Sequence, residues 1–467
     1  MLDSWRDDFP TLQKRLAGPA FTSDTPGYDD EVAVFNEAVR HQPAIVVGAV
    51  GAADVGVAVE FASQHGMDIA VLNTGHGPSV AAGPMTLMIT TKRMSKVEID
   101  ADTSTARVEA GVRFGQLVEA AAIFGLAPLP GSAPGVGVVG YTLAGGASAT
   151  MGRRYGWAAD HVSALDVVTA DGRFRRVTQS SDADLFSALL GGKGNFGVVT
   201  AMEFALFPVT RLYAGTLFYS GESLKDVLTA YLRFTATAPD DIATGLAILN
   251  FPPLPDLPPF MQGKVVVAVR VSYVGCEFAG ARLIEPLRQA APVLLDTVAD
   301  IPFTEFGSIT ADPTEPAAAV EHFGLLRELP ENAVDAIVDV AGPQAGSRVN
   351  LIDIRHLQGA YSRPPSFPNA VGARDAAFAF FALTVVPPGQ AVADYRESGQ
   401  EFVDAVSPWL HHMGNPSFQG PADATESATA RAYDRETYKR LQAVKAKFDP
   451  FNRFRTNHNI PPEPSAA

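Results

Sequence analysis

The sequence predicts an α+β protein of two domains, in which the second domain is an antiparallel sheet with helices on one face. A length of 467 residues is more than one domain of roughly 150 residues usually needs. Glycine clusters are frequent up to Pro208, and Pro-rich loops replace them after it. We therefore expect residues 20–208 to form the first domain, 209–414 to form the second, and 415–467 to return to the first.

Composition and charge limit the classes of protein that fit this chain. Hydrophobic residues make up 47% of the sequence, which is enough for a large packed core. The net charge of -15 disfavours nucleic acid and anionic membranes as partners. The single cysteine, Cys276, excludes an intrachain disulfide and a cysteine metal cluster, and we expect no metal site. Without a signal-peptide pattern or a run of ~18 apolar residues, the expectation is a cytoplasmic monomer or homodimer.

Hydrophobic periodicity places the regular elements. The first domain is expected to open with a strand–helix–strand unit, whose strands span 44–48 and 68–72. Two hairpins follow, over 97–110 and 165–177, each with a short helix after it. The second domain is expected to alternate strands near 212–219, 243–250, 264–275, 348–357 and 376–387 with helices near 222–236, 279–291 and 390–406. A last helix over 435–447 is expected to turn its charged side chains to solvent.

The glycine-rich segments of the first domain point to a phosphate-bearing cofactor. Gly135, Gly137 and Gly140 match the dinucleotide fingerprint, and Asp160 follows about 20 residues later. That fingerprint should follow a strand, however, and the three prolines in 126–134 exclude a regular central strand there. Glycine turns also form concave anion sites from backbone N–H groups and allow a pyrophosphate to approach the main chain closely. Four such clusters favour a large cofactor over turns that are only structural.

Five motifs occur in a fixed order and together resemble one family. They are Asn73-Thr-Gly-His76 after a strand, Pro134-Gly-Val-Gly-Val-Val-Gly140, Tyr155-Gly156 with Asp160, Gly194-Asn-Phe-Gly-Val-Val199, and the ending 448–459. The set resembles the berberine-bridge-enzyme-like FAD-linked oxidases of the vanillyl-alcohol-oxidase superfamily. The resemblance spans 44–207 and 433–462 and is weaker between them. It implies a two-subdomain FAD-binding domain, a substrate domain, and FAD as the cofactor.

The resemblance also implies how FAD is attached. His76 stands where the family bonds a histidine to the flavin C8 methyl group. Many members add a second bond through a cysteine, and Ala133 stands at that place, so His76 is expected to be the only link, as in singly linked bacterial members. Val136 falls where the family has a small gate beside the flavin, and valine there is similar to members that react with oxygen. The alternative for Val136 is an ordinary apolar loop residue.

Further cofactor-binding residues are implied by the same motifs. They are Asn73, Thr74, Gly75, Gly77, Gly137, Gly140, Tyr141, Gly145, Tyr155, Gly156, Asp160, Gly194, Gly197, Val198, Val199, Asn457 and Asn459. For the two asparagines, a turn before Pro461 is an equally good interpretation.

The residues that contact the substrate are expected on a strand of the second domain. Period two places Val349, Leu351, Asp353 and Arg355 on one face of the segment 349–356. Family members carry an acidic residue near Asp353, which makes Asp353 and Arg355 candidates for the active site. The alternative is a surface ion pair on a half-exposed strand. The family's tyrosine-any-asparagine-phenylalanine motif falls on 415–418, where the tyrosine and asparagine are missing, which counts against a sugar-oxidase mechanism.

These observations predict an FAD-dependent oxidase of a small organic substrate. The substrate is expected to be an alcohol, an amine or a natural-product intermediate of secondary metabolism, with molecular oxygen as acceptor. Three alternatives remain open. The first is a flavin-dependent oxygenase, cyclase or redox-neutral tailoring enzyme, the second is a dehydrogenase with another acceptor, and the third is a binding protein without turnover.

Overall fold

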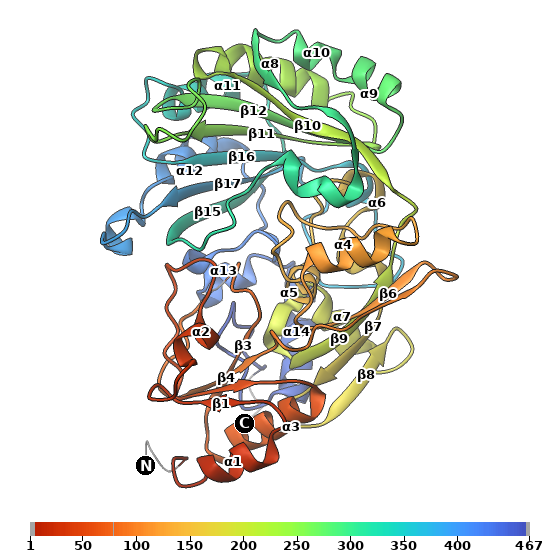
Figure 1. Cartoon of the computed structure of the whole chain (residues 1–467), viewed down its shortest axis with the longest axis vertical. Coiled ribbons are helices and arrows are strands. Elements are labelled where there is room, and N and C mark those ends of the chain that lie inside the picture. Colours follow the sequence, from red (N-terminus) through yellow and green to blue (C-terminus); the bar gives the residue numbers. More distant parts are fainter. Residues whose placement is uncertain (1–4, 78, 464–467) are drawn as a thin grey trace.

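The computed structural model describes residues 5–77 and 79–463 and contains three sheets (Figure 1). A four-stranded and a five-stranded sheet lie in one half of the molecule, and an eight-stranded sheet lies in the other. The expected α+β architecture is confirmed. Each sheet has its own hydrophobic core, and the largest core extends from the five-stranded sheet to the C-terminal helix.

The four-stranded sheet contains the expected strand–helix–strand unit. Its strands, in spatial order, are β1 (Ala20–Phe21), β2 (Ile45–Gly48), β4 (Thr86–Thr90) and β3 (Asp68–Leu72). Helix α3 (Ala52–Gln64) joins β2 to β3, and the two short helices α1 (Phe9–Arg15) and α2 (Tyr28–Val32) precede β2. Strand β4 pairs in parallel with both β2 and β3 and separates them, so the predicted unit lacked its central strand.

The five-stranded sheet is antiparallel and contains both predicted hairpins. Its strands, in spatial order, are β5 (Val97–Asp100), β6 (Thr105–Glu109), β9 (Val198–Ala205), β7 (Val162–Val168) and β8 (Phe174–Thr178). Its neighbouring helices are α4 (Phe114–Ala122), α5 (Val138–Leu143), α6 (Gly152–Tyr155) and α7 (Ala183–Gly192). Strand β9 lies between the hairpins and joins them into one sheet, which no local pattern in the sequence specifies.

The eight-stranded sheet is antiparallel throughout, and its helices lie on the face away from the two smaller sheets (Figure 1). Its strands are β13 (Val293–Asp296), β10 (Arg211–Ser220), β12 (Val265–Tyr273), β11 (Ile242–Asn250), β16 (Leu351–His356), β17 (Phe378–Val385) and β15 (Ala319–Leu326), and β14 (Ala299–Pro302) also pairs with β10. Its helices are α8 (Leu224–Thr235), α9 (Glu277–Leu283), α10 (Glu285–Arg288), α11 (Asn332–Ala341) and α12 (Gln400–Val406). This arrangement confirms the predicted antiparallel sheet with helices on one face.

Several elements of this half differ from the expectation. Strands β13, β14 and β15 and helix α11 were not predicted. The helix expected over 279–291 is divided into α9 and α10, because Pro286 falls in the first turn of the second helix. The helix expected over 390–406 reduces to α12, which begins after Gly399 in the left-handed conformation at φ 97°.

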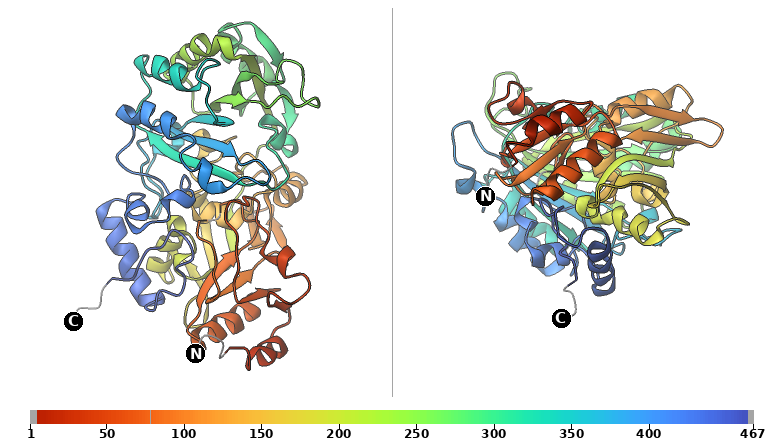
Figure 2. Two further views of the ribbon diagram at one scale, coloured as in Figure 1. Left: turned by 90° about the vertical axis from the view of Figure 1, so that its left-hand side faces the viewer. Right: turned by 90° about the horizontal axis from the view of Figure 1, so that it is seen from below.

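The end of the chain runs back beside the half that holds the two smaller sheets (Figure 2). Helices α13 (Glu426–Ala430) and α14 (Arg435–Phe448) belong to this return, and α14 packs against α7. In the described ranges, no helix is both long enough and apolar enough to cross a lipid bilayer.

Candidate active site

The loop after β3 presents His76 between two segments that are distant in sequence. The His76 ring is stacked on Phe35, with centroids 4.1 Å apart and planes 6° apart. A Cβ atom on Gly135 would lie 3.7 Å from the ring, an ordinary van der Waals distance, so the segment that contains Gly135 lies against His76. Nδ1 of His76 is 2.8 Å from Oγ1 of Thr74. Burial, assisted by the positive charge of Arg113, lowers the pKa of His76 to about 4, so its imidazole is neutral at pH 7.

Two glycines allow this loop to pack closely. Gly75 has φ 66°, and a Cβ atom there would lie 2.6 Å from Cβ of Val34. A Cβ atom on Gly137 would lie 2.7 Å from Nδ2 of Asn73, which donates a hydrogen bond to the carbonyl of Ala110. The residues predicted from the first two motifs therefore lie together.

A short strap of residues 35–37, which sequence reasoning missed, connects this loop to the eight-stranded sheet. On one side Phe35 and Asn36 donate backbone hydrogen bonds to the carbonyls of Thr74 and Gly75, at 3.2 and 3.3 Å. On the other side the strap pairs with residue 317, just before β15. The Asn36 amide accepts from the backbone N–H of Ala319 and donates to its carbonyl, at 3.0 and 3.1 Å. No local pattern in the sequence marks this strap.

The Asn36 amide also donates a hydrogen bond to Glu321, a glutamate whose burial makes the stability of the protein depend on pH. Burial raises the pKa of Glu321 to about 7, and the hydrogen bond from Asn36 opposes the shift. A raised folded-state pKa means that this contribution to stability is present below about pH 4.5 and is lost as the pH rises through about 7.

We expect Glu321→Gln to remove that pH dependence. The free energy of unfolding of the wild type minus that of the variant should decrease by up to about 3 kcal/mol when the pH is raised from 5 to 8. Urea titrations of both proteins at the two pH values measure this difference. An equal difference at both pH values contradicts the assignment.

The segment 131–146 forms the middle of the site. Val136 is half-buried, and its backbone N–H donates to the carbonyl of Ala133 at 3.3 Å. The Tyr141 ring lies edge-on to Phe114, and burial raises its pKa well above the usual value. Within the described residues the buried Tyr141 hydroxyl has no hydrogen-bond partner.

Several of the predicted glycines border open space or a tight contact. Added Cβ atoms on Gly77 and Gly140 would meet nothing within 4 Å. Gly145 has φ 121°, and a Cβ atom there would lie 2.8 Å from Oγ of Ser417. Gly197 has φ 153°, and a Cβ atom there would lie 2.5 Å from the carbonyl of Val168. Glycine is therefore required at 145 and 197, whereas 77 and 140 leave room beside the main chain.

The C-terminal segment is attached to the glycine motif through Asn195, which the sequence analysis did not single out. Its Nδ2 donates to the carbonyl of His458 at 3.0 Å, and its Oδ1 accepts from the N–H of Ile460 at 2.9 Å. Asn457 and Asn459 flank His458 in the sequence. A Cβ atom on Gly194 would lie 4.0 Å from Nδ2 of Asn457. Within the described residues the buried Oδ1 atoms of both asparagines have no partner.

Two predicted cofactor residues are accounted for by sheet packing. Val198 and Val199 lie in β9, opposite Val168 and Val167 of β7, and both are buried. Their side chains therefore contribute to the cores of the two smaller sheets. A cofactor-binding role for them stays a prediction.

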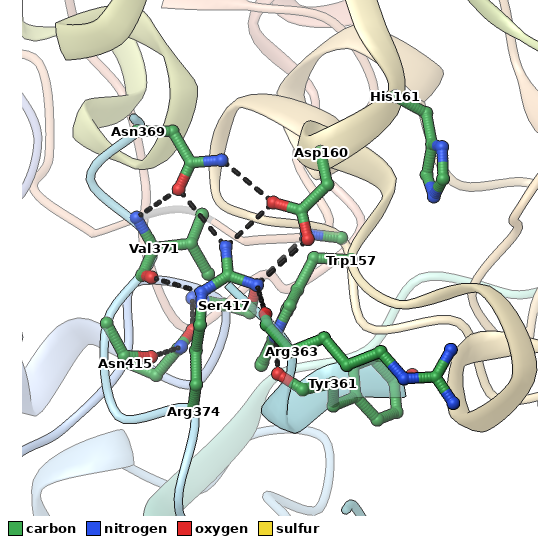
Figure 3. A network of polar contacts seen from close by, with 12 residues as sticks. Trp157, Asp160, His161, Tyr361, Arg363, Asn369, Val371, Arg374, Asn415 and Ser417 are labelled. Atoms are coloured by element: carbon green, nitrogen blue, oxygen red, sulfur yellow. Dashed lines mark hydrogen bonds and ion pairs between the residues drawn. The ribbon is translucent and has the colours of Figure 1, made fainter. Parts of the chain in front are cut away.

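Asp160 has structural partners that the sequence did not reveal (Figure 3). Its carboxylate accepts two hydrogen bonds from Arg374, at 2.7 and 2.8 Å, and one from Asn369 at 2.8 Å. These contacts hold the turn that contains Asp160 against the loop before β17. The bidentate ion pair explains the aspartate without a cofactor. The neighbouring Gly156 has φ 93°, and the Tyr155 ring packs on Phe207 with centroids 4.0 Å apart and planes tilted by 32°.

Residues 415–418, where the family's tyrosine is missing, also have a structural role. Ser417 accepts a hydrogen bond from the N–H of Gly146 at 3.1 Å and donates one to the carbonyl of Ala144 at 2.8 Å. Asn415 accepts from the N–H of Ser417 and donates to the carbonyl of Gly372. These contacts attach the C-terminal return to the glycine-rich segment.

A pocket lies between the glycine-rich segment and the eight-stranded sheet. Ser132 and Thr310 line it on one side, and Arg270, Asp353 and Arg355 line it on the other. Asp353 is only 1% exposed, so the alternative of a surface ion pair is wrong. Its Oδ2 accepts from Nε of Arg355 at 2.8 Å and lies 3.3 Å from Nη1 of Arg270. The pocket therefore brings Asp353 and Arg355, the two predicted substrate-side residues, close to Ser132, the residue before Ala133.

Comparison with known proteins identifies the family. The family model described as FAD binding domain matches residues 43–178, and the one described as berberine and berberine like matches residues 417–461. Among curated proteins, (R)-6-hydroxynicotine oxidase of Paenarthrobacter nicotinovorans is 28% identical over 465 residues, which cover 96% of this chain and 98% of the relative.

Solved structures agree over nearly the whole chain. The 6-hydroxy-D-nicotine oxidase of Arthrobacter nicotinovorans superposes with a TM-score of 0.83 at 25% identity, covering 96% of this chain and 98% of that one. A chitooligosaccharide oxidase has a TM-score of 0.83 at 21% identity, covering 99% of this chain and 100% of that one, and this likeness shows the fold alone. The chain is therefore an FAD-dependent oxidoreductase that belongs to the berberine-bridge-enzyme-like oxidases of the vanillyl-alcohol-oxidase superfamily.

Proposed function

We propose that this chain is an oxidase that removes a hydride from a small alcohol, amine or natural-product intermediate and uses oxygen as the electron acceptor. The observation that carries the proposal is the pocket that brings Asp353 and Arg355 to Ser132, beside the segment that packs on His76. The similarity to (R)-6-hydroxynicotine oxidase supports an amine among the substrates. We further propose that 20–208 with 415–467 hold the cofactor and that 209–414 cover the substrate.

The residues present fit FAD. The unpartnered Oδ1 atoms of Asn457 and Asn459 are acceptors in need of a donor, and leaving each unpaired would cost about 1–3 kcal/mol. The open space at Gly77 and Gly140 lets a large group approach the main chain. We infer that His76 forms the single covalent link, because Ala133 offers no thiol. When bound, FAD accepts two electrons from the substrate and passes them to oxygen, which yields hydrogen peroxide.

The chain's own residues bind and orient the substrate. Within the described residues Oδ1 of Asp353 has no partner, although it is buried in the pocket wall. We propose that it accepts the hydrogen bond of the substrate's O–H or N–H group and so orients the neighbouring C–H bond. Arg355 fixes this carboxylate through its Nε atom. Val136 is proposed to leave oxygen a path to the reaction site.

Oxygen consumption tests the oxidase assignment. We expect the purified yellow protein to consume oxygen and release hydrogen peroxide in equal amounts when an oxidisable substrate is found in a screen of alcohols and amines. An oxygen electrode and a peroxidase-coupled assay measure the two quantities. Turnover that requires an artificial acceptor would contradict the oxidase, and incorporation of labelled oxygen into the product would indicate an oxygenase.

A further inference from the structure

Three charged side chains meet in the pocket wall, and their charges do not cancel. Arg270 comes from β12, and Asp353 and Arg355 come from β16. Two guanidinium groups and one carboxylate give a surplus of one positive charge. The two arginine side chains are only 12% and 22% exposed. A buried positive charge without an anionic partner is costly, so the cluster is incomplete as it stands.

Strand register explains how the two arginines come to share one carboxylate. Gly245 of β11 lies between them, opposite Arg270 on one side and Arg355 on the other. Strands are about 4.8 Å apart, so the two arginine Cα atoms are separated by roughly 10 Å. A Cβ atom on Gly245 would lie 3.4 Å from Oδ1 of Asp353, so the glycine leaves the space between the guanidinium groups free of side chains.

Donors remain available on both guanidinium groups. Asp353 uses one oxygen, Oδ2, for both arginines. In the described part of the chain, the two terminal nitrogens of Arg355 have no hydrogen bond to a protein acceptor, and the side chain of Arg270 has no polar partner other than Asp353. The Arg355 guanidinium lies over the Phe381 ring, 5.2 Å from its centroid. Arginine presents its donors in a planar fork that matches a carboxylate.

Other charged groups do not supply the missing anion. The negative charge of Asp312 helps to raise the pKa of Arg355, but Asp312 is not among the residues that line the pocket. Tyr361 lines the pocket and its hydroxyl donates to the carbonyl of Ser148. Burial raises the pKa of Tyr361, which keeps this phenol neutral at pH 7.

We propose that Arg270 and Arg355 bind a carboxylate group of the substrate, so that the enzyme acts on organic acids. This inference rests on the proposed function in one respect, because it takes the pocket to be the substrate pocket. The carboxylate of the substrate completes the charge of the cluster, while Oδ1 of Asp353 remains free to accept from the group that is oxidised.

Benzoate and benzamide, which share a shape and differ in charge, test the proposal. Titration of the purified protein, followed by the visible flavin spectrum and by the melting temperature, should give a Kd for benzoate at least tenfold below that for benzamide. Arg270→Gln should raise the Kd for benzoate about tenfold and leave that for benzamide unchanged. Asp353→Asn should lower the Kd for benzoate several-fold, because it removes the competing negative charge. The matched control is Arg211→Gln, which alters an exposed ion pair with Asp300 on the same sheet and should change neither Kd.

Two results would overturn the proposal. One is an equal Kd for benzoate and benzamide in the wild type. The other is a change in the same direction for Arg270→Gln and Asp353→Asn, which indicates loss of structure instead of loss of charge. Neither readout requires turnover, and the melting temperature requires no flavin. A protein that binds benzoate selectively but consumes no oxygen would therefore contradict the oxidase assignment alone.

Discussion

Replacing His76 with alanine is expected to leave a colourless pellet after acid precipitation, whereas the wild-type pellet stays yellow. Acid unfolds the protein and releases any cofactor that is held only by non-covalent contacts. A covalent bond survives this treatment. Covalent bonding requires a nitrogen lone pair, and the low pKa of His76, about 4, keeps its imidazole neutral at pH 7. In the tautomer that donates from Nδ1 to Thr74, the lone pair belongs to Nε2, beside Gly135.

A second histidine of the same half provides the matched control. His65 also packs on a phenylalanine, Phe61, with ring centroids 4.3 Å apart, but it lies at the end of α3. The pellet of His65→Ala should stay yellow. Absorbance of the redissolved pellet near the flavin maximum measures the bound flavin per chain. A colourless wild-type pellet would refute the covalent link and leave the membership of the family intact.

The residues around His76 show what the sequence can specify. Gly75 is required because a side chain there would collide with the main chain of Val34, and a side chain at Gly137 would displace the amide of Asn73. A steric constraint of this kind favours glycine at a fixed position of a motif, so it can be recognised in the sequence. The hairpins and the alternation of β16 were predictable for a similar reason, since the period of two depends only on the strand itself.

Contacts between distant segments are what the sequence could not specify. Arg270 faces Asp353 only because β12, β11 and β16 are neighbours in one register, with Gly245 between them. The strap at 35–37 depends in the same way on residue 317. A shift in the register of one strand would separate Arg270 from Asp353, or the strap from residue 317. Nothing in the local pattern of residues determines which strands become neighbours.

Lys445 does not lie where the local sequence pattern predicts, and replacing it is expected to have a large effect on stability. The charged residues of the last helix were expected to face solvent, but the Lys445 side chain is fully buried. Its Nζ atom lies 2.6 Å from Oδ2 of Asp449 and donates to the carbonyls of Asn195 and Phe454, at 2.7 and 3.1 Å. Burial lowers the pKa of Lys445 to about 8, which still leaves the ammonium charged at pH 7.

We expect Lys445→Met to lower the free energy of unfolding by about 3–5 kcal/mol, the typical cost of removing one partner from a buried ion pair. Methionine fills a similar volume, so the loss reflects the uncompensated charge of Asp449 and the two carbonyls that lose their donor, and not a cavity. The matched control is Lys439→Met on the exposed side of the same helix, which should change stability by less than about 0.5 kcal/mol. Urea titration measures both variants, and a loss below about 1 kcal/mol for Lys445→Met would contradict the burial of the pair.

The same substitution should also weaken the hold on the cofactor. Lys445 donates to the carbonyl of Asn195, and the Asn195 side chain in turn fixes His458 and Ile460. These are the contacts that place Asn457 and Asn459 beside the glycine motif. We therefore expect the flavin spectrum of Lys445→Met to lose its fine structure at urea concentrations at which the far-ultraviolet circular dichroism is still native. Coincident loss of both signals would show that the C-terminal segment unfolds together with the sheets, so that Lys445 contributes to the fold as a whole and not specifically to the cofactor site.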